Sequence, residues 1–324
     1  MNETLLQVEH LSKYFDVQEQ MLGRSGGKVK AVDDISFSVK QNSIFALVGE
    51  SGCGKSTTAR LILRLLAATS GKVVFDGNDL FSLPTDAMRK VRRDIQMIFQ
   101  DPYSSLNPRW RIDKILKEPL ATHGIGTSAE RSELVQEILS TVGLPPESGA
   151  KYSHEFSGGQ RQRIGIARAL ITRPKFVICD EPISALDVSI QAQIINLLGK
   201  LQAEFNLTYL FITHDLRVVR FLCDRVGVMY LGKLVETGST AEIFSHTAHP
   251  YTQALFSAIP QPDPTAEKNE ILLEGDVPSP INPPSGCRFH TRCAHAMPIC
   301  TQEEPSLVAI GDDHYCACHL HNKK

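Results

Sequence analysis

The segment Gly49–Ser56, with the sequence GESGCGKS, constrains the fold more than any other part of the chain. It follows the apolar run Ile44–Val48 and precedes Thr57–Leu66, which has the composition of a helix. Glycines allow the backbone to curl so that several N–H groups point at one anion, and a helix start adds unpaired donors and a positive dipole end. Lys55 is expected to bridge the outer phosphates of a nucleotide, and Ser56 to bind Mg²⁺. The order of strand, loop and helix therefore predicts a phosphate-binding loop.

Composition limits the classes of function that a chain of this kind can have. Its 324 residues suit two or three domains, and its 34 basic and 36 acidic side chains nearly cancel. We therefore expect no nucleic-acid partner. No apolar run approaches the ~20 residues that span a bilayer, and Met1–Thr4 lacks the pattern of a secretion signal. A cytosolic protein is expected, with any membrane role exerted through partners.

Strand patterns occur on both sides of the loop. Before it, Leu5–Val8 and Ile35–Val39 are predicted strands, and Gly23–Lys28 between them is a predicted surface loop. After it, Lys72–Gly77 and Ile95–Phe99 are also predicted strands. The N-terminal part is therefore predicted to be rich in β-structure.

The middle of the chain changes character. Residues 107–155 favour helices, and with the helix that follows they form a predicted helical insert over about residues 107–172. Strand patterns return at Phe176–Glu181 and Leu207–Thr213, and apolar residues from Ile190 to Leu201 follow helical spacing between them. Strand–helix–strand alternation predicts a largely parallel sheet, with ligands at the carboxyl ends of its strands.

The last third has three parts. Arg225–Tyr230 and Lys233–Gly238 are predicted to form a hairpin. Proline is dense from Ile259 to Pro284, which is typical of a linker or an extended wrap. A cysteine-rich tail follows. We predict a domain over residues 4–258 and a distinct C-terminal region over residues 259–324.

Four polar residues at predicted strand ends are candidates for chemistry on the nucleotide. Asp180 ends a buried strand, where a carboxylate can hold Mg²⁺ directly or through water. Glu181 follows it and is placed to orient and partly deprotonate an attacking water. Gln100, where a strand ends, could contact Mg²⁺ or this water, and His214 could bond a terminal phosphate.

A second anion-binding helix start is predicted at Ser157, Gly158, Gly159 and Gln160, before an apparent helix over Arg161–Ile171. Ser157 can cap this helix, and the glycines permit close approach of the backbone to an anion. One nucleotide does not need two such loops in one subunit. Two subunits that face each other head to tail would use both.

These residues together resemble the ATP-binding cassette (ABC) family over residues 4–245. The motifs match in order: Gly49–Ser56 the Walker A loop, Gln100 the Q-loop, Ser157–Gln160 the signature motif, Phe176–Glu181 Walker B, Ser184–Asp187 the D-loop and His214 the H-loop. Phe156 replaces the leucine that is commoner before the signature serine. The resemblance gives Phe15, with Tyr14 as the near alternative, the role of stacking on adenine.

The resemblance implies an α/β fold: a P-loop ATPase core with a mixed sheet, a β-rich N-terminal subdomain, a helical insert and a Pro/Cys-rich C-terminal tail. It implies an ATPase that uses ATP and Mg²⁺, with Glu181, His214 and Gln100 as catalytic residues. Residues expected on the chain's own nucleotide are Phe15, Gly49, Glu50, Ser51, Gly52, Cys53, Gly54, Lys55, Ser56, Thr57, Gln100 and Asp180. Those expected on the nucleotide of a partner are Ser157, Gly158, Gly159, Gln160 and Asp187.

Four longer segments look like the oligopeptide/dipeptide importer ATPases: Asp101–Arg109, Ser184–Gln193, His249–Leu255 and Gly286–Cys293. That resemblance implies a second, different ATPase subunit, two transmembrane permeases and an extracytoplasmic binding protein, at the cytoplasmic face of a bacterial or archaeal-type cell membrane. Nickel and other small-solute importers lie close by. Soluble ABC ATPases of DNA repair or ribosome function are a more distant alternative, because they usually carry two cassettes or long coiled-coil inserts.

The tail holds a candidate metal site. Cys287, Cys293, Cys300 and Cys318 lack the paired two-residue gaps of most zinc ribbons. Four thiolates could hold a [4Fe–4S] cluster, as in some members that resemble this chain. Cys316 competes with Cys318 as the fourth ligand. Four reduced thiols and a zinc site are the alternatives.

Overall fold

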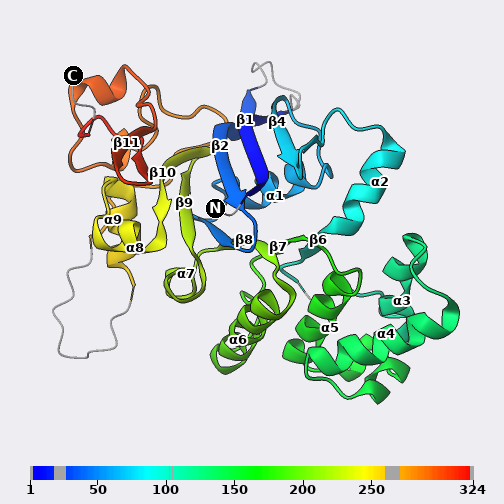
Figure 1. The fold of residues 1–324 in the computed structure, drawn as a ribbon. Helices are drawn as coiled ribbons and strands as arrows, with labels where there is room; N and C mark the ends of the chain where they lie inside the picture. The colour runs from blue at the N-terminus through cyan, green and yellow to red at the C-terminus, as the bar shows by residue number, and fades with distance from the viewer. Residues whose placement is uncertain (1–2, 18–26, 102, 104, 260–270, 322–324) are drawn as a thin grey trace. The chain divides into compact units, whose positions relative to one another are not determined.

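The fold is described from a computed structural model, which describes residues 3–17, 27–101, 103, 105–259 and 271–321 (Figure 1). The chain divides into two compact units, each built from separate stretches of sequence. Unit 1 comprises Met1–Glu3, Lys40–Ser43 and Ser82–Ile212. Unit 2 comprises Thr4–Val39, Ile44–Phe81 and Thr213–Lys324.

Unit 2 contains an antiparallel sheet made mainly by the N-terminal strands. Strand β1 (Thr4–Asp16) lies between β2 (Lys28–Lys40) and β4 (Ser70–Phe75), and β5 (Asn78–Asp79) pairs with β4. Apolar side chains such as Leu6 are fully buried along β1. The predicted β-rich N-terminal part is confirmed, and β1 and β2 are longer than the sequence patterns indicated.

A second sheet in unit 2 carries the glycine-rich loop. Strand β3 (Ile44–Val48) is buried throughout and pairs in parallel with β9 (Arg225–Tyr230). Strand β10 (Lys233–Ser239) pairs antiparallel with β9, as the predicted hairpin requires. The hairpin turns through Leu231 and Gly232, which both have positive φ, 44° and 81°, as tight hairpins favour.

The C-terminal tail extends this same sheet. Strand β12 (His314–Cys316) pairs antiparallel with β10, and β11 (Val308–Gly311) pairs antiparallel with β12. In the order of the sheet β12 lies next to β10 and β11 lies outside β12, and Figure 1 shows β11 on this side of β10. Strands β11 and β12 were not predicted from the sequence. Residues 271–289, before the tail's first turn, form neither helix nor strand, as expected of a linker or wrap.

The helices of unit 2 are short. They are α1 (Lys55–Ile62), α7 (Leu216–Leu222), α8 (Thr240–Ser245) and α9 (Pro250–Ser257). Two single-turn 3₁₀ helices in the tail are η3 (His290–Arg292) and η4 (Pro298–Thr301). Helix α1 ends earlier than predicted, and Arg64 just beyond it has a positive φ of 51°, which a helix cannot continue.

Unit 1 combines a parallel sheet with the helical insert. Strands β6 (Ile95–Ile98), β7 (Phe176–Asp180) and β8 (Thr208–Thr213) pair in parallel, and α6 (Val188–Phe205) is the predicted crossover between β7 and β8. Helix α2 (Thr85–Asp94) precedes β6. The insert contains α3 (Ile112–Thr122), α4 (Ser128–Thr141), the 3₁₀ turns η1 (Pro146–Ala150) and η2 (Ser153–Glu155), and α5 (Gly158–Leu170).

Some predicted features lie outside the described residues. Residues 23–26 of the predicted surface loop are among them. So are Pro102 and Ser104 of the importer-like segment Asp101–Arg109, and the prolines at 260, 262 and 264. No helix within the described ranges combines the length and the apolar character needed to cross a membrane.

Candidate nucleotide-binding site

The glycine-rich loop runs from β3 into α1, as predicted. Gly49, Gly52 and Gly54 all have positive φ, at 148°, 80° and 111°. A Cβ atom on Gly49 would lie 2.2 Å from the Met229 carbonyl oxygen, and one on Gly54 would lie 2.2 Å from that of Ala31. Only glycine fits these two positions, because both the backbone angle and the space exclude a side chain.

The side chain of Lys55 points into this loop. It is 5% exposed, and its Nζ donates to the carbonyl oxygens of Gly49 at 2.7 Å and Glu50 at 2.9 Å. Cys53 lies beside it, with Sγ 3.7 Å from Nζ. Burial raises the pKa of the Cys53 thiol, and this outweighs the opposing effect of Lys55. The thiol is therefore neutral and does not compete with an anionic ligand for the ammonium group.

The aromatic candidate for adenine stacking lies on β1 in the same unit. The Phe15 side chain is 38% exposed, with Lys13 Nζ 4.9 Å from its ring centroid. The alternative, Tyr14, donates its hydroxyl to the Asp33 carboxylate. Burial and this hydrogen bond raise the pKa of Tyr14. Phe15 is therefore the better placed of the two rings for contact with a ligand.

Two of the predicted catalytic side chains meet in unit 1. Gln100 Nε2 donates to Glu181 Oε2 at 2.8 Å. Glu181 has a φ of 45°, and its N–H donates to the Ile212 carbonyl oxygen on β8 at 2.9 Å. A positive φ in a non-glycine residue costs about 1–2 kcal/mol and persists where surrounding contacts hold it. Asp180, just before it at the end of β7, is 4% exposed.

The second glycine-containing helix start is also in unit 1. Ser157 caps α5: its side chain accepts from the Gln160 N–H at 3.4 Å, and Gln160 Oε1 accepts from the Ser157 N–H at 3.0 Å. A Cβ atom on Gly159 would lie 2.5 Å from Ile190 Cγ2. Ser157 and Gln160 are exposed, as is Asp187 at the start of α6. The capped helix start is confirmed, and its face is accessible to a ligand or a partner.

The candidate residues thus divide between the two units. Phe15, the loop Gly49–Ser56 with Thr57, and the exposed His214 belong to unit 2. Gln100, Asp180, Glu181, Ser157–Gln160 and Asp187 belong to unit 1.

Two residues that the sequence did not suggest contact the loop at Glu50. The Glu50 N–H donates to the Tyr251 hydroxyl at 2.9 Å, and Arg292 Nη1 donates to Glu50 Oε2 at 3.0 Å. They lie 201 and 242 positions from Glu50 along the chain, so no local pattern connects them with the loop. Tyr251 lies in His249–Leu255 and Arg292 in Gly286–Cys293, two segments that look like the importer ATPases. This resemblance was the only feature of the sequence that could have pointed to them.

The cysteines of the tail gather without forming a metal site. Burial raises the pKa of Cys287 to about 11, and the neighbouring Cys300, Cys318 and Cys293 add to this shift. Cys316 is fully buried, on β12. Within the described residues, however, no group of three or more His, Cys, Asp or Glu side chains is arranged so that it could hold a metal ion. The arrangement therefore does not support the predicted [4Fe–4S] cluster with either choice of fourth ligand, nor a zinc site.

A phosphate loop between a buried strand and a helix, an acidic strand end and a second capped glycine-containing helix start define an ATP-binding cassette ATPase. Residues 32–184 match the ABC transporter family, and residues 235–300 match the family described as oligopeptide/dipeptide transporter, C-terminal region. Among solved structures, a dimeric cassette, MJ0796, bound to ADP and phosphate is 28% identical with a TM-score of 0.64, and the match covers 73% of this chain and 99% of that one. The cbiO1 protein of Clostridium perfringens, part of an ABC transporter complex, has the same identity and TM-score, over 76% and 92% of the two chains.

Curated relatives extend the similarity to the whole chain. The oligopeptide transport ATP-binding protein AppF of Bacillus subtilis (strain 168) is 52% identical over 99% of this chain and 98% of its own length. A putative peptide import ATP-binding protein of Brucella ovis is 50% identical over 98% of each chain. The chain belongs to the ABC transporter ATP-binding family, in its oligopeptide/dipeptide group, and its activity is the hydrolysis of ATP in transport.

Proposed function

We propose that this chain is the ATP-hydrolysing subunit that powers import of dipeptides and oligopeptides through an ABC transporter. The observation that carries the proposal is the similarity to AppF, because it covers 98% of that relative's length and includes the C-terminal tail. The tail also matches the C-terminal region of oligopeptide/dipeptide transporters. A cassette alone would indicate only an ABC ATPase of unspecified use.

Each candidate residue has a proposed role on the chain's own ATP. Lys55 binds the outer phosphates, and Ser56 and Asp180 bind Mg²⁺. Glu181 orients the attacking water with the help of Gln100, and their hydrogen bond of 2.8 Å supports this pairing. Three further contacts complete the proposal: Phe15 stacks on adenine, His214 bonds the terminal phosphate, and the backbone N–H groups of residues 49–57 surround the phosphates.

We propose that a second ATPase subunit, of a different sequence, completes each site. Ser157, Gly158, Gly159, Gln160 and Asp187 then act on the nucleotide held by that partner, and the exposure of Ser157, Gln160 and Asp187 supports this role. Closure of the pair on ATP and reopening after hydrolysis drive two permeases, which receive peptide from an extracytoplasmic binding protein. The chain then lies at the cytoplasmic face of the membrane as a peripheral subunit.

The alternatives differ in cargo or in machine. A nickel or other small-solute importer would use the same residues for ATP, so the site cannot separate it from a peptide importer. A soluble ATPase of DNA repair or ribosome function is not favoured, because the full-length relatives are transport proteins.

Reconstitution of the complex tests the function. When this chain is co-expressed with its permeases and second ATPase and placed in vesicles, a peptide-loaded binding protein should stimulate ATP hydrolysis severalfold, and labelled peptide should accumulate. A nickel-loaded binding protein should not stimulate ATP hydrolysis. If only the nickel-loaded binding protein stimulated hydrolysis, the proposed cargo would be nickel and not peptide. Tight ATP-linked binding to ribosomes or DNA without permeases would overturn the proposal of an importer.

The iron–sulfur cluster has its own test. From the arrangement of the tail cysteines we expect chain purified without oxygen to contain less than about one iron per polypeptide, because a [4Fe–4S] cluster needs four thiolate ligands in one group. Iron and acid-labile sulfide assays and the visible absorption spectrum measure this. Four irons and four sulfides per chain, lost in Cys300→Ser but not in Cys223→Ser, would establish the cluster.

A further inference from the structure

Glu50, the second residue of the glycine-rich loop, is held by three different side chains of unit 2. Its carbonyl oxygen accepts from Lys55, its N–H donates to Tyr251, and its carboxylate accepts from Arg292. Lys55 is part of the loop and helix start itself. Tyr251 lies on α9 and Arg292 ends η3 in the tail, so two of the three contacts come from the C-terminal part of the chain.

An aromatic cluster fixes the segment that precedes Arg292. Phe289, three residues before it, is 2% exposed and packs edge-on against Tyr230 with ring centroids 5.3 Å apart. The same ring lies 5.5 Å from that of Tyr251, which lies 4.7 Å from Tyr230. Such ring pairs add stability beyond that of the buried area alone. This packing fixes the chain three residues before Arg292, in the same turn of the tail.

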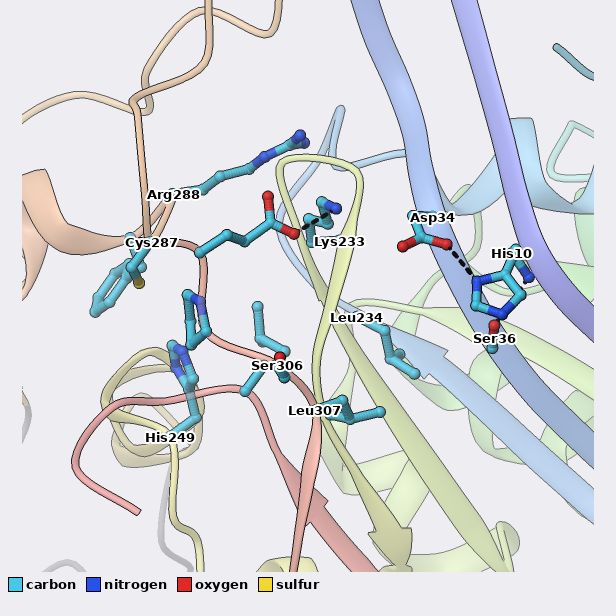
Figure 2. A pocket seen from close by; sticks show the side chains of 15 residues that line it. His10, Asp34, Ser36, Lys233, Leu234, His249, Cys287, Arg288, Ser306 and Leu307 are labelled. Carbon is cyan, nitrogen blue, oxygen red and sulfur yellow. Dashed lines mark hydrogen bonds and ion pairs between the residues drawn. The ribbon is translucent and has the colours of Figure 1, made fainter. Parts of the chain in front are cut away.

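Further contacts attach the tail to the rest of unit 2 around a cavity of about 290 Å³ (Figure 2). There Arg288 donates to Asp33 and to the Leu231 carbonyl oxygen, and Lys233 pairs with Glu304 at 2.6 Å. These contacts hold the tail through residues that are not part of the glycine-rich loop.

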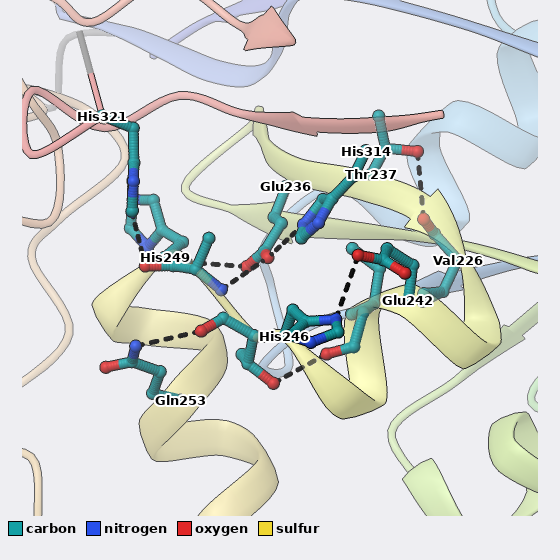
Figure 3. Close-up of polar contacts among 12 residues, drawn as sticks. Val226, Glu236, Thr237, Glu242, His246, His249, Gln253, His314 and His321 are labelled. Atoms are coloured by element: carbon teal, nitrogen blue, oxygen red, sulfur yellow. Dashed lines mark hydrogen bonds and ion pairs between the residues drawn. The ribbon is translucent and has the colours of Figure 1, made fainter. Parts of the chain in front are cut away.

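The buried carboxylate of Glu236 forms a third attachment (Figure 3). It accepts from His314 Nε2 on β12 at 2.8 Å and from the N–H groups of Ala248 and His249 at 2.8 and 3.0 Å. The tail is therefore anchored at several independent points. Removing one ion pair, such as that of Arg292, need not release it.

The ion pair between Arg292 and Glu50 is largely shielded from water. The Arg292 side chain is 8% exposed and that of Glu50 is 27% exposed. Burial lowers the pKa of Arg292, but contacts with Tyr230 and Glu50 outweigh burial and raise it, so the guanidinium is charged. Without it, Glu50 would leave an unpaired negative charge on a loop whose ligand is itself a polyanion.

We propose that Arg292 is a positioning residue for ATP binding: it neutralises and orients Glu50, so that the C-terminal cysteine-containing segment sets the affinity of the loop for ATP. This inference rests on the proposed role of Gly49–Ser56 in binding the phosphates of ATP. It assigns the tail an effect on the nucleotide site that requires no bound metal. It acts on the binding of ATP and not on the chemical step.

Four variants of the full chain test the proposal. Arg292→Ala should raise the Kd for Mg-ATP about tenfold, equivalent to about 1.4 kcal/mol, and raise the KM of the assembled complex with kcat within twofold. Arg292→Lys, which keeps the charge, should recover most of the affinity. Glu50→Gln with Arg292→Ala should also recover it, because the unpaired charge is then absent. Glu304→Gln, the matched control, breaks the Lys233 pair of the same tail and should leave Kd within twofold.

The outcomes separate the two levels of the proposal. An unchanged Kd in Arg292→Ala, while Lys55→Met still abolishes binding, overturns the role of Arg292 and leaves the proposed function intact. Equal losses in Arg292→Ala and in its double variant with Glu50→Gln would mean that packing and not charge is responsible, which also overturns it. Failure of the unmodified chain to bind ATP would overturn the proposed function itself.

Discussion

Glu181→Gln should lower ATP turnover by about 100-fold or more while ATP still binds, a loss within the range for removal of a general base. The replacement keeps the size of the side chain and an oxygen that can accept from Gln100, so the contact at 2.8 Å can persist. It removes the negative charge that orients and partly deprotonates water. Because hydrolysis then fails after binding, the paired subunits should accumulate in the closed, ATP-bound form.

Phosphate release measures the turnover, and a fluorescent ATP analogue measures binding. Size-exclusion chromatography with the second ATPase subunit, with and without ATP, detects the closed pair. Glu133→Gln, an exposed site on α4, is the matched control and should behave as the unmodified chain. Hydrolysis within threefold of normal in Glu181→Gln would refute the role given to Glu181.

Lys55→Met should weaken ATP binding by about 100-fold, which corresponds to about 2.7 kcal/mol. The ammonium group points into the loop and is nearly fully buried, so a phosphate there would make a charge-assisted hydrogen bond that solvent screens little. Methionine has a similar length and no charge, so the packing around the side chain is preserved better than with alanine.

Titration of the full chain with Mg-ATP by calorimetry gives the affinity. Lys200→Met, an exposed lysine on α6, controls for loss of positive charge in general. Without nucleotide, the loss in free energy of unfolding, obtained from the melting temperature, should be smaller than the loss in free energy of ATP binding. The folded protein without ATP loses only two hydrogen bonds to carbonyl oxygens. If Lys55→Met bound ATP with normal affinity, the phosphate-binding role of this loop would be wrong.

Local patterns predicted the parts of the fold where the signal lies within a few residues. Ile44–Val48 and the glycines after it were sufficient to predict the strand, the loop and the helix that follows. A buried strand, a backbone with positive φ angles and a helix start each favour particular residue types. The same holds for the hairpin on either side of Leu231 and Gly232. The capped helix start at Ser157 was identified for the same reason: serine, two glycines and glutamine satisfy the helix's own N–H groups.

Long-range pairing was not predictable in this way. Val308–Gly311 and His314–Cys316 are short strands among polar residues, and they are strands because β10 offers them a partner. The contact of Arg292 with Glu50 depends on the same folding back of the tail. The number of cysteines in the tail and the resemblance to importer ATPases suggested a [4Fe–4S] cluster, whereas no group of three or more His, Cys, Asp or Glu side chains in the described part of the chain is arranged to hold a metal ion.

The pairing of β12 with β10 bears on how far the protein can be shortened. A polypeptide that stops at the predicted boundary, residue 258, would keep the pairing of β10 with β9 but leave the other edge of β10 unpaired, and Glu236 would lose His314. Exposed strand edges of this kind invite pairing between molecules and precipitation. Without truncation the strand at this edge of the sheet is the four-residue β11, and its short length limits such contacts. The C-terminal tail thus covers an edge of the sheet that carries the glycine-rich loop, and this limits association between molecules.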